Sequence, residues 1–288
     1  MIQCSDDLIS PSLGGSLTIL TCSQSPPRES EDHVRVCGPR GAGEYDLRVK
    51  SKILLSWSSG KDSAWALHLL RRQDQYEIAG LVTTVNSAFD RVAMHSTRRV
   101  LVELQAAAAG LPLKVVDLPW RCSNAEYERI MRTVCDEAVA QGITGFAFGD
   151  LFLADIRAYR ERQLKGTGLE PIFPLWLMPT CNLAEEMIAN GLRAKLVCVD
   201  PAKLAPDFAG RDFDKQLLSD LPPGVDPCGE NGEFHSFVYA GPMFTREIPV
   251  MTGERVQRDG FWFCDVAPTL RNGVSGGLLD PVVERPPR

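Results

Sequence analysis

The sequence lacks several features that mark particular classes of protein. Its nine cysteines include no C-x-x-C pair, the spacing typical of zinc knuckles and iron–sulfur sites, so we predict no metal-binding residues of that kind. A disulfide framework is not expected either, because the chains that depend on one are small secreted domains and this chain has 288 residues. These absences favour a cytoplasmic protein with reduced thiols.

Long apolar runs and an excess of basic residues are also missing. No apolar stretch approaches the roughly 20 residues that cross a bilayer, and the first twenty residues include two aspartates without a basic start. The formal net charge is −6, whereas a large nucleic-acid-binding surface needs clustered lysine and arginine. The sequence therefore indicates neither a membrane protein nor a protein with a strong nucleic-acid signal.

Apolar residues are plentiful and follow a regular pattern. They make up 44% of the chain, which is enough for a sizeable core in one or two domains. From residue 52 onward, strand-like segments alternate with helical patterns, which is typical of a parallel sheet wrapped by helices. We predict the following segments: strands at 52–57, 78–85, 113–116 and 145–149, then helices at 62–72, 97–109 and 124–141, the last opened by a capping pair, Ser123 and Glu126.

The two ends and the last third of the chain differ from this pattern. Residues 1–49 are rich in Ser, Gly and Pro without periodicity, so we predict a disordered leader, and residues 267–288 similarly predict a flexible tail. We therefore predict a doubly wound α/β domain over residues 50–177 and a smaller α+β domain over residues 178–266. Its predicted elements are a helix from a cap at Asn182 and Glu185 to Asn190, a strand at 194–199, a helix at 214–221, and strands near 237–239, 248–252 and 261–266.

The six residues between the first strand and the first helix predict a nucleotide site. A helix start has unpaired N–H groups and a partial positive charge, so a Gly-containing turn in front of it can hold a polyphosphate. Lys61 adds a full charge and the serines add hydroxyl donors. The residues of this turn are Ser58, Ser59, Gly60, Lys61, Asp62 and Ser63.

The ordinary P-loop, G-x-x-x-x-G-K-S/T, is a competing interpretation that fails at two positions. The first glycine would fall on Leu55, and Asp62 stands where a hydroxyl is required. A third interpretation is a serine-rich turn with an incidental lysine, which the position between a strand and an amphipathic helix disfavours. The motif instead resembles the PP-loop of ATP pyrophosphatases, which split ATP between the α and β phosphates.

Other polar residues follow predicted strands, at the edge where parallel α/β sheets bind ligands. Thr83 belongs to the end of the second strand, while Gly149 and Asp150 follow the fourth. Asp150 is either a site residue or a cap for the next helix. His95 either contacts a phosphate or the adenylate, or only opens a helix.

Two further groups are candidates for substrate binding or for proton transfer. Arg157 and Arg160 share one face of a predicted helix and either meet an acidic substrate or form a solvated charged face. In the later loop, Glu230, Glu233 and His235 could bind a substrate or act as a general base. The alternative for that loop is a polar turn, with glycines and Asn231 supplying its geometry.

Residues 50 to about 266 resemble the diphthine–ammonia ligase family. The motifs that carry the resemblance are the SSGKDS turn, the R-V-x-M-H segment at 91–95, the G-D pair at 149–150, the P-L-W segment at 174–176 and the G-E-N-G-E-F-H run at 229–235. Ser59 departs from the usual glycine at the second position of S-G-G-K-D-S. The G-E-N-G-E-F-H-S form is closer to prokaryotic relatives than to the eukaryotic G-E-G-G-E-Y-E-T style.

The resemblance implies an adenine nucleotide alpha hydrolase-like (HUP) domain and AMP-forming ligation of the EC 6.3.1 type. ATP with Mg²⁺ would activate a carboxylate, such as one on a modified residue of a translation factor, and ammonia would convert it into an amide. The implied catalytic residues are Lys61, Asp150, Glu233 and His235. The implied nucleotide-binding residues are Ser58, Ser59, Gly60, Lys61, Asp62, Ser63, Thr83, His95 and Gly149. The implied acceptor-binding residues are Arg157, Arg160, Glu230, Asn231 and Gly232. With ammonia as the second substrate, Glu230, Glu233 and His235 could bind ammonia, bind the acceptor, or act as a general base.

Asp62 would repel phosphate directly, so its expected role is to cap the helix or to hold magnesium through water. Two alternatives for the whole protein remain. One is another PP-loop ATP pyrophosphatase acting on tRNA or a small molecule, and the other is a non-catalytic adenine-nucleotide sensor.

Overall fold

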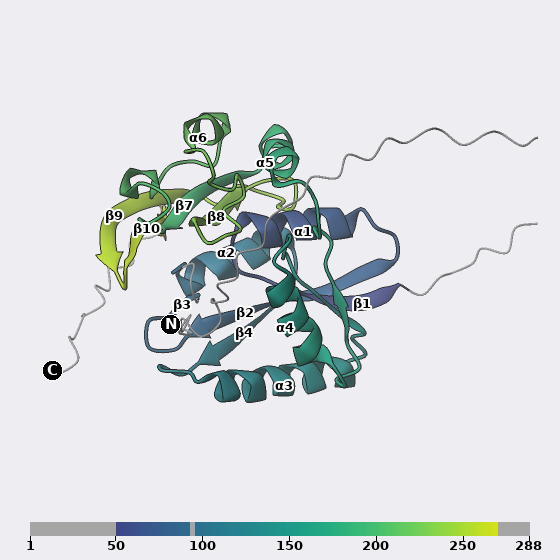
Figure 1. Cartoon of the computed structure of the whole chain (residues 1–288). Helices are drawn as coiled ribbons and strands as arrows, with labels where there is room; N and C mark the ends of the chain where they lie inside the picture. Colours follow the sequence, from purple (N-terminus) through teal and green to yellow (C-terminus); the bar gives the residue numbers. More distant parts are fainter. Residues whose placement is uncertain (1–49, 93–95, 270–288) are drawn as a thin grey trace, which may run out of the picture. The chain divides into compact units, whose positions relative to one another are not determined.

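Two β-sheets organise the part of the chain that this computed structural model describes, residues 50–92 and 96–269, which belong to one compact unit (Figure 1). The larger sheet has the order β3-β2-β1-β5-β6, with β4 pairing on β2, and every pairing is parallel except that of β3. Its strands are β1 (Ser51–Ser56), β2 (Tyr76–Asn86), β3 (Arg91–Val92), β4 (Leu113–Leu118), β5 (Gly145–Ala147) and β6 (Glu170–Ile172).

The order of these strands creates a switch point beside β1. The chain first proceeds from β1 to β2 and β4 on one side, and then returns to place β5 and β6 on the other side. In such sheets the ligand crevice lies outside the carboxyl ends of the strands at the reversal. The predicted phosphate turn follows β1, and Gly149 and Asp150 follow β5, so both lie at the switch point.

Helices cover both faces of the larger sheet (Figure 1). On one face lie α1 (Lys61–Arg71) and α2 (Arg99–Ala109), and on the other lie α3 (Asn124–Ala140) and α4 (Ala154–Leu164). Val134, Cys135 and Ala138 of α3 pack on Val82 and Phe146 of the sheet. The buried residues of α3 recur at a spacing close to the helical repeat, so one side of this helix lies on the sheet. By contrast, α1 is buried at five consecutive positions, 63–67, because it is covered on more than one side.

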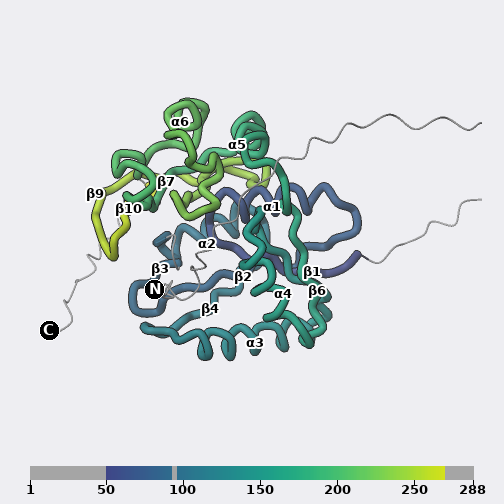
Figure 2. The backbone as a smooth tube through the Cα atoms, in the orientation of Figure 1, coloured from purple at the N-terminus to yellow at the C-terminus, as the bar shows by residue number. Residues whose placement is uncertain are grey.

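The smaller sheet is antiparallel, with the order β8-β7-β10-β9. Its strands are β7 (Arg193–Val199), β8 (Phe234–Ala240), β9 (Val250–Arg258) and β10 (Phe261–Pro268). The associated helices are α5 (Thr180–Ala189), α6 (Lys215–Asp220) and the short 3-10 turn η2 (Pro206–Phe208). The tube in Figure 2 shows β7–β10, α5 and α6, coloured green to yellow, gathered on the side of α1 and α2 that faces away from the larger sheet.

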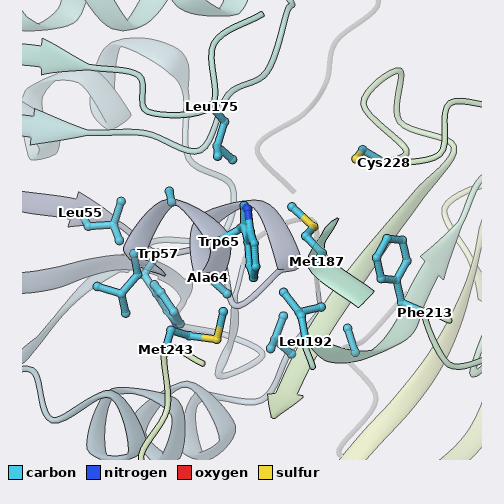
Figure 3. Close-up of a cluster of buried hydrophobic side chains, with 14 of the residues drawn as sticks. Leu55, Trp57, Ala64, Trp65, Leu175, Met187, Leu192, Phe213, Cys228 and Met243 are labelled. Atoms are coloured by element: carbon cyan, nitrogen blue, oxygen red, sulfur yellow. The ribbon is translucent and has the colours of Figure 1, made fainter. Parts of the chain in front are cut away.

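One large hydrophobic cluster joins the two sheets through α1 and α2. Trp57 and Trp65 belong to the same buried cluster as Met187, Phe213 and Met243 from the later half of the chain (Figure 3). A separate cluster packs α2 against β7 and β8. Burial of this apolar surface holds the smaller sheet over the amino end of α1, where the phosphate turn lies.

These elements confirm the predicted α/β fold class with its parallel-dominated sheet, and they correct several details. The Ser123 hydroxyl accepts a hydrogen bond from the Glu126 amide, as predicted for the start of α3. The Asn182 cap is wrong, because α5 begins at Thr180 directly after Pro179. The strands β3 and β6 were not predicted. Residues 1–49, 93–95 and 270–288, including the predicted leader and most of the predicted tail, lie outside the described residues.

Candidate functional site

The turn after β1 has a backbone conformation that favours glycine at its second residue. Ser59 has φ 72°, in the left-handed region, and its side chain is fully buried. The Ser59 hydroxyl donates to Thr97 Oγ1 at 2.9 Å, and this contact helps a serine to occupy the position. The departure from S-G-G-K-D-S therefore has a local compensation.

Substitutions at Ser59 should separate the backbone strain from the hydroxyl contact. Ser59→Ala keeps the strained φ and leaves Thr97 without its partner, so we expect a loss of about 1–3 kcal/mol in the free energy of unfolding. Ser59→Gly loses the same contact but relieves the backbone, so its loss should be smaller by about 1 kcal/mol. Urea unfolding measures both values; equal losses for the two variants would contradict a strained Ser59.

The hydroxyls of the turn gather at the amino end of α1. Ser58 Oγ and Ser63 Oγ lie 3.2 Å apart, Gly60 N–H donates to Ser58 Oγ at 3.3 Å, and Ser63 Oγ donates to the Gly60 carbonyl at 3.1 Å. Gly60 is the N-cap residue and supplies no side-chain cap, and Asp62 does not cap the helix as one of its predicted roles required. The positive end of the helix dipole is thus surrounded by hydroxyl groups, which suits an anion.

Lys61 is buried against the second sheet and paired with its neighbour. Its ammonium group lies 2.9 Å from Asp62 Oδ2, and 5.5 Å and 6.0 Å from the ring centres of Phe234 and Phe213. Burial alone would lower the pKa of Lys61, but the neighbouring acidic groups, Asp62 foremost among them, together outweigh it and raise the pKa, so the lysine stays charged. Burial raises the pKa of Asp62 despite the pairing.

Gly149 allows the loop after β5 to contact the phosphate turn directly. A Cβ atom at this position would lie 2.9 Å from both Asp62 C and Ser63 N, closer than real Cβ contacts. Asp150 follows and forms an ion pair of 3.6 Å with Arg160, whose guanidinium lies 5.0 Å from the centre of the Phe148 ring. Burial raises the pKa of Asp150 against the attraction of Arg160. The two loops at the switch point are therefore in van der Waals contact.

The loop at 226–235 is organised by Asp226. Its Oδ1 accepts from the amides of Cys228 and Glu230 at 2.8 and 3.3 Å, and its Oδ2 accepts from the Thr180 hydroxyl at 2.6 Å. Gly229 and Gly232 both have positive φ, at 68° and 82°, as the predicted turn geometry requires. Burial raises the pKa of the Cys228 thiol well above its usual range, so this cysteine stays protonated.

Glu230 connects this loop to the carboxyl edge of the larger sheet. Its Oε1 accepts from the amides of Leu151 and Phe152 at 2.9 and 3.4 Å. Burial, together with repulsion from Asp62, raises the pKa of Glu230 to about 7. The run at 229–235 and the phosphate turn, far apart in the sequence, are therefore close enough to interact electrostatically.

The raised pKa of Glu230 predicts a pH dependence of stability. Because the folded protein holds this proton more tightly than the unfolded chain, the free energy of unfolding should fall as the pH rises from 4.5 to about 7. Glu230→Gln keeps an oxygen that can accept from Leu151 and should flatten this dependence. Urea midpoints across the range measure the effect, and Glu185→Gln, at an exposed position on α5, controls for the loss of one charge. An unchanged slope in Glu230→Gln would contradict the assignment.

Glu233 and Thr83 each have a buried oxygen without a hydrogen-bond partner among the described residues. Glu233 is 3% exposed; its Oε1 accepts from Asp226 N–H and Asn231 Nδ2, while Oε2 is unpaired. Thr83 is 2% exposed, near the carboxyl end of β2. Unsatisfied buried oxygens are costly, and they are the groups to which a ligand would add a hydrogen bond.

The remaining predicted residues occupy different surroundings. Arg157 lies 4.8 and 4.7 Å from the ring centres of Phe173 and Trp176 and pairs with Glu161, so its guanidinium is held in place but only half buried. Arg160 is engaged by Asp150. His235 lies on β8, opposite Cys198 of β7. His95 lies outside the described residues, but both flanks of its segment are held, because Arg91 and Arg98 donate to Asp265 of β10.

Sequence reasoning missed three residues that connect the two sheets at this site. Ser236 Oγ accepts from Lys61 N–H at 3.1 Å, Asp265 accepts from Arg91 and Arg98, and Gln105 bonds to the phosphate turn. Only Gln105 had a usable signal, since it falls on the buried face of α2, between Leu101 and Ala109. A polar residue at such a position needs partners.

Residues 50–92 and 96–269 contain neither a cluster of metal-binding side chains nor a membrane-spanning helix. No group of three or more His, Cys, Asp or Glu side chains there is arranged to hold a metal ion. No helix in those ranges is long and apolar enough to cross a membrane.

Known proteins resemble this chain in both halves. The diphthamide synthase N-terminal domain matches residues 50–170 and the diphthamide synthase C-terminal domain matches residues 179–269. The diphthine–ammonia ligase of Bos taurus is 29% identical, over 58% of this chain and 68% of its own length. That of Rattus norvegicus is 31% identical, over 54% and 60%, and that of Homo sapiens 28%, over 58% and 68%.

Among solved structures, a U34-tRNA thiolase from Methanococcus maripaludis aligns with a TM-score of 0.33 and 18% identity, over 50% of this chain and 59% of that chain.

The two domain matches meet near residue 175, in the segment that leads from β6 to α5. Together they cover nearly all of the described residues, so this chain belongs to the diphthamide synthase family.

Proposed function

We propose that this protein is an ATP-dependent ligase that converts a carboxylate into an amide with ammonia, releasing AMP and pyrophosphate. The observation that carries the proposal is the meeting of the two most specific motifs. Glu230 of the run at 229–235 bonds to the loop after β5, which itself contacts the phosphate turn through Gly149. The curated relatives are diphthine–ammonia ligases, so a diphthine-like carboxylate on a translation factor is the proposed acceptor.

The first step needs a bound diphosphate as leaving group. A carboxylate oxygen of the acceptor attacks the α phosphorus of ATP. The bond between this phosphorus and the oxygen that bridges the α and β phosphates breaks, and pyrophosphate leaves. Ser58 and Ser63 are proposed to donate to the phosphates through their hydroxyls. Ser59 and Gly60 are proposed to do so through their backbone N–H groups, because the Ser59 hydroxyl is buried and donates to Thr97. Lys61 offsets the negative charge that develops on pyrophosphate. Thr83, with its unpaired hydroxyl, is proposed to contact the nucleotide from β2. Gly149 contributes by its closeness to the turn, and His95 stays a prediction.

The residues present fit a magnesium ion only if the nucleotide supplies some of its ligands. Among the described residues, no three His, Cys, Asp or Glu side chains are grouped to hold a metal ion, but buried oxygens of Asp62 and Asp150 lack hydrogen-bond partners. Mg²⁺ in nucleotide sites is held by one or two carboxylates together with phosphates and water, and it would supply charge neutralisation there. Asp62 and Asp150 are the residues proposed to hold it.

The second step is the attack of ammonia on the acyl carbon, with cleavage of the bond to AMP. Ammonium must lose a proton before it attacks, and the amine loses another as the amide forms. Glu233, with its unpaired Oε2, and His235 are the proposed acceptors of these protons. Glu230, Asn231 and Gly232 shape the acceptor side, and Arg157 is proposed to bind the acceptor carboxylate. Arg160 forms an ion pair with Asp150, so its predicted contact with the acceptor would require breaking that pair.

The test is product analysis with purified protein, ATP, Mg²⁺, ammonium and a carboxylate acceptor, including diphthine-bearing translation factor. We expect AMP and pyrophosphate in equal amounts, formed only when acceptor is present. ADP and phosphate as products would contradict the mechanism. Tight ATP binding without turnover on any acceptor would favour the nucleotide sensor, and turnover on tRNA would favour another PP-loop enzyme.

A further inference from the structure

The side chain of Gln105 is a buried amide that holds the phosphate turn in place through hydrogen bonds. It projects from α2 with 0% exposure and makes three hydrogen bonds to three different segments. Its Oε1 accepts from Trp57 Nε1 at 2.8 Å, and its Nε2 donates to the carbonyls of Ser59 at 3.0 Å and Val238 at 2.6 Å. One side chain therefore joins Trp57, the residue directly after β1, to the phosphate turn and to β8.

The Ser59 carbonyl is held from two directions. It accepts from Gln105 Nε2 and also from the Val238 amide of β8 at 3.0 Å. Because the peptide bond is planar and trans, fixing this carbonyl also fixes the opposite direction of the next N–H, that of Gly60. That N–H donates to Ser58 Oγ at 3.3 Å, among the hydroxyls of the turn.

The strain at Ser59 makes this support necessary. A serine at φ 72° relaxes to a more favourable conformation unless its surroundings hold it there. Gln105 is the only side chain in the described residues that donates to the Ser59 carbonyl. The second domain takes part as well, because Val238 belongs to β8 of the smaller sheet.

We propose that Gln105 is a positioning residue for the diphosphate of ATP, acting through the Ser59 peptide and coupling the smaller sheet to nucleotide binding. This inference rests on the proposed function. It differs from a purely structural role in one respect. The loss of Gln105 should weaken the binding of ligands that carry the diphosphate and should leave the binding of ligands without it unchanged. AMP lacks the pyrophosphate that the turn is proposed to hold.

The test compares Gln105→Met, which keeps the length of the side chain and removes all three hydrogen bonds, with Thr167→Val as a matched control. Thr167 is 9% exposed and its hydroxyl makes two hydrogen bonds, to Leu164 O and from Leu169 N–H, in the turn between α4 and β6. Calorimetry measures the binding of α,β-methylene-ATP, inorganic pyrophosphate and AMP to each variant, well below its unfolding temperature.

We expect Gln105→Met to lower the affinity for α,β-methylene-ATP and for pyrophosphate by about tenfold or more, and the affinity for AMP by less than about twofold. Thr167→Val should leave all three affinities unchanged. Unchanged pyrophosphate affinity in Gln105→Met, or an equal loss for AMP and pyrophosphate, would overturn the inference. A wild-type protein that binds none of the three ligands would instead overturn the proposed function itself.

Hydrogen exchange on the wild-type protein provides a second measurement if the methionine variant does not fold. Pyrophosphate should slow exchange of the Val238 amide, because a ligand that holds the turn also holds the acceptor of that hydrogen bond. AMP should leave the exchange rate unchanged. Equal rates with and without pyrophosphate at a saturating concentration would overturn the coupling.

Discussion

Lys61→Met is expected to slow the formation of AMP and pyrophosphate by about 10²–10³-fold, the typical cost of removing one preorganised group from developing negative charge. The lysine is charged, buried and attached to the first turn of α1, so it requires little reorganisation when charge develops on the leaving group. Single-turnover measurement of AMP at saturating ATP separates this effect from weaker binding.

The pairing of Lys61 with Asp62 requires a second variant. Removing the lysine alone leaves the partly buried Asp62 carboxylate without its partner, so stability should fall by up to about 3–5 kcal/mol, the cost of breaking a fully buried pair. In Lys61→Met/Asp62→Asn the unpaired charge is gone, so stability should recover. The rate of AMP formation should not recover, because the positive charge is still missing. Recovery of both the stability and the rate in the double variant would mean that Lys61 only neutralises Asp62. A rate within tenfold of the wild-type value in Lys61→Met would exclude a major role for the lysine.

Gly149→Ala is expected to weaken ATP binding by at least about tenfold and to lower the free energy of unfolding by about 1–3 kcal/mol, as overpacking usually does. The added methyl would lie 2.9 Å from Asp62 C and Ser63 N, which are backbone atoms and cannot rotate away. The first turn of α1 would have to move, and with it the groups proposed to hold the phosphates.

Gly253→Ala is the matched control for this substitution. Gly253 lies in the exposed strand β9, and its nearest neighbour to an added Cβ is Asp265 Cβ at 3.5 Å, an ordinary contact. We expect this variant to bind ATP as the wild-type protein does. Normal ATP affinity in Gly149→Ala, measured by calorimetry, would show that the phosphate turn does not depend on the loop after β5.

How much of the fold could be predicted depended on the length of each element. The helix α3 matched within one residue because seventeen residues carry the helical repeat and Ser123 supplies a local cap. The strands β3 and β6 have two and three residues, too few to display an alternating pattern, and they form only because neighbours pair with them. The start of α5 was misplaced because Pro179 ends the preceding segment and the Thr180 hydroxyl is taken by Asp226, 46 residues away.

The candidate site was predictable to a similar extent. The strand, turn and helix around Lys61 and the α/β class follow from local sequence, because backbone donors, turn residues and apolar periodicity act over a few neighbouring positions. How that turn is supported and covered depends instead on contacts between residues far apart in the chain. Lys61 N–H bonds to Ser236, 175 positions away, and Gln105 to Val238, 133 positions away. Contacts of this kind follow from the packing of the smaller sheet on α1 and α2, and no local pattern encodes which polar groups that packing brings together.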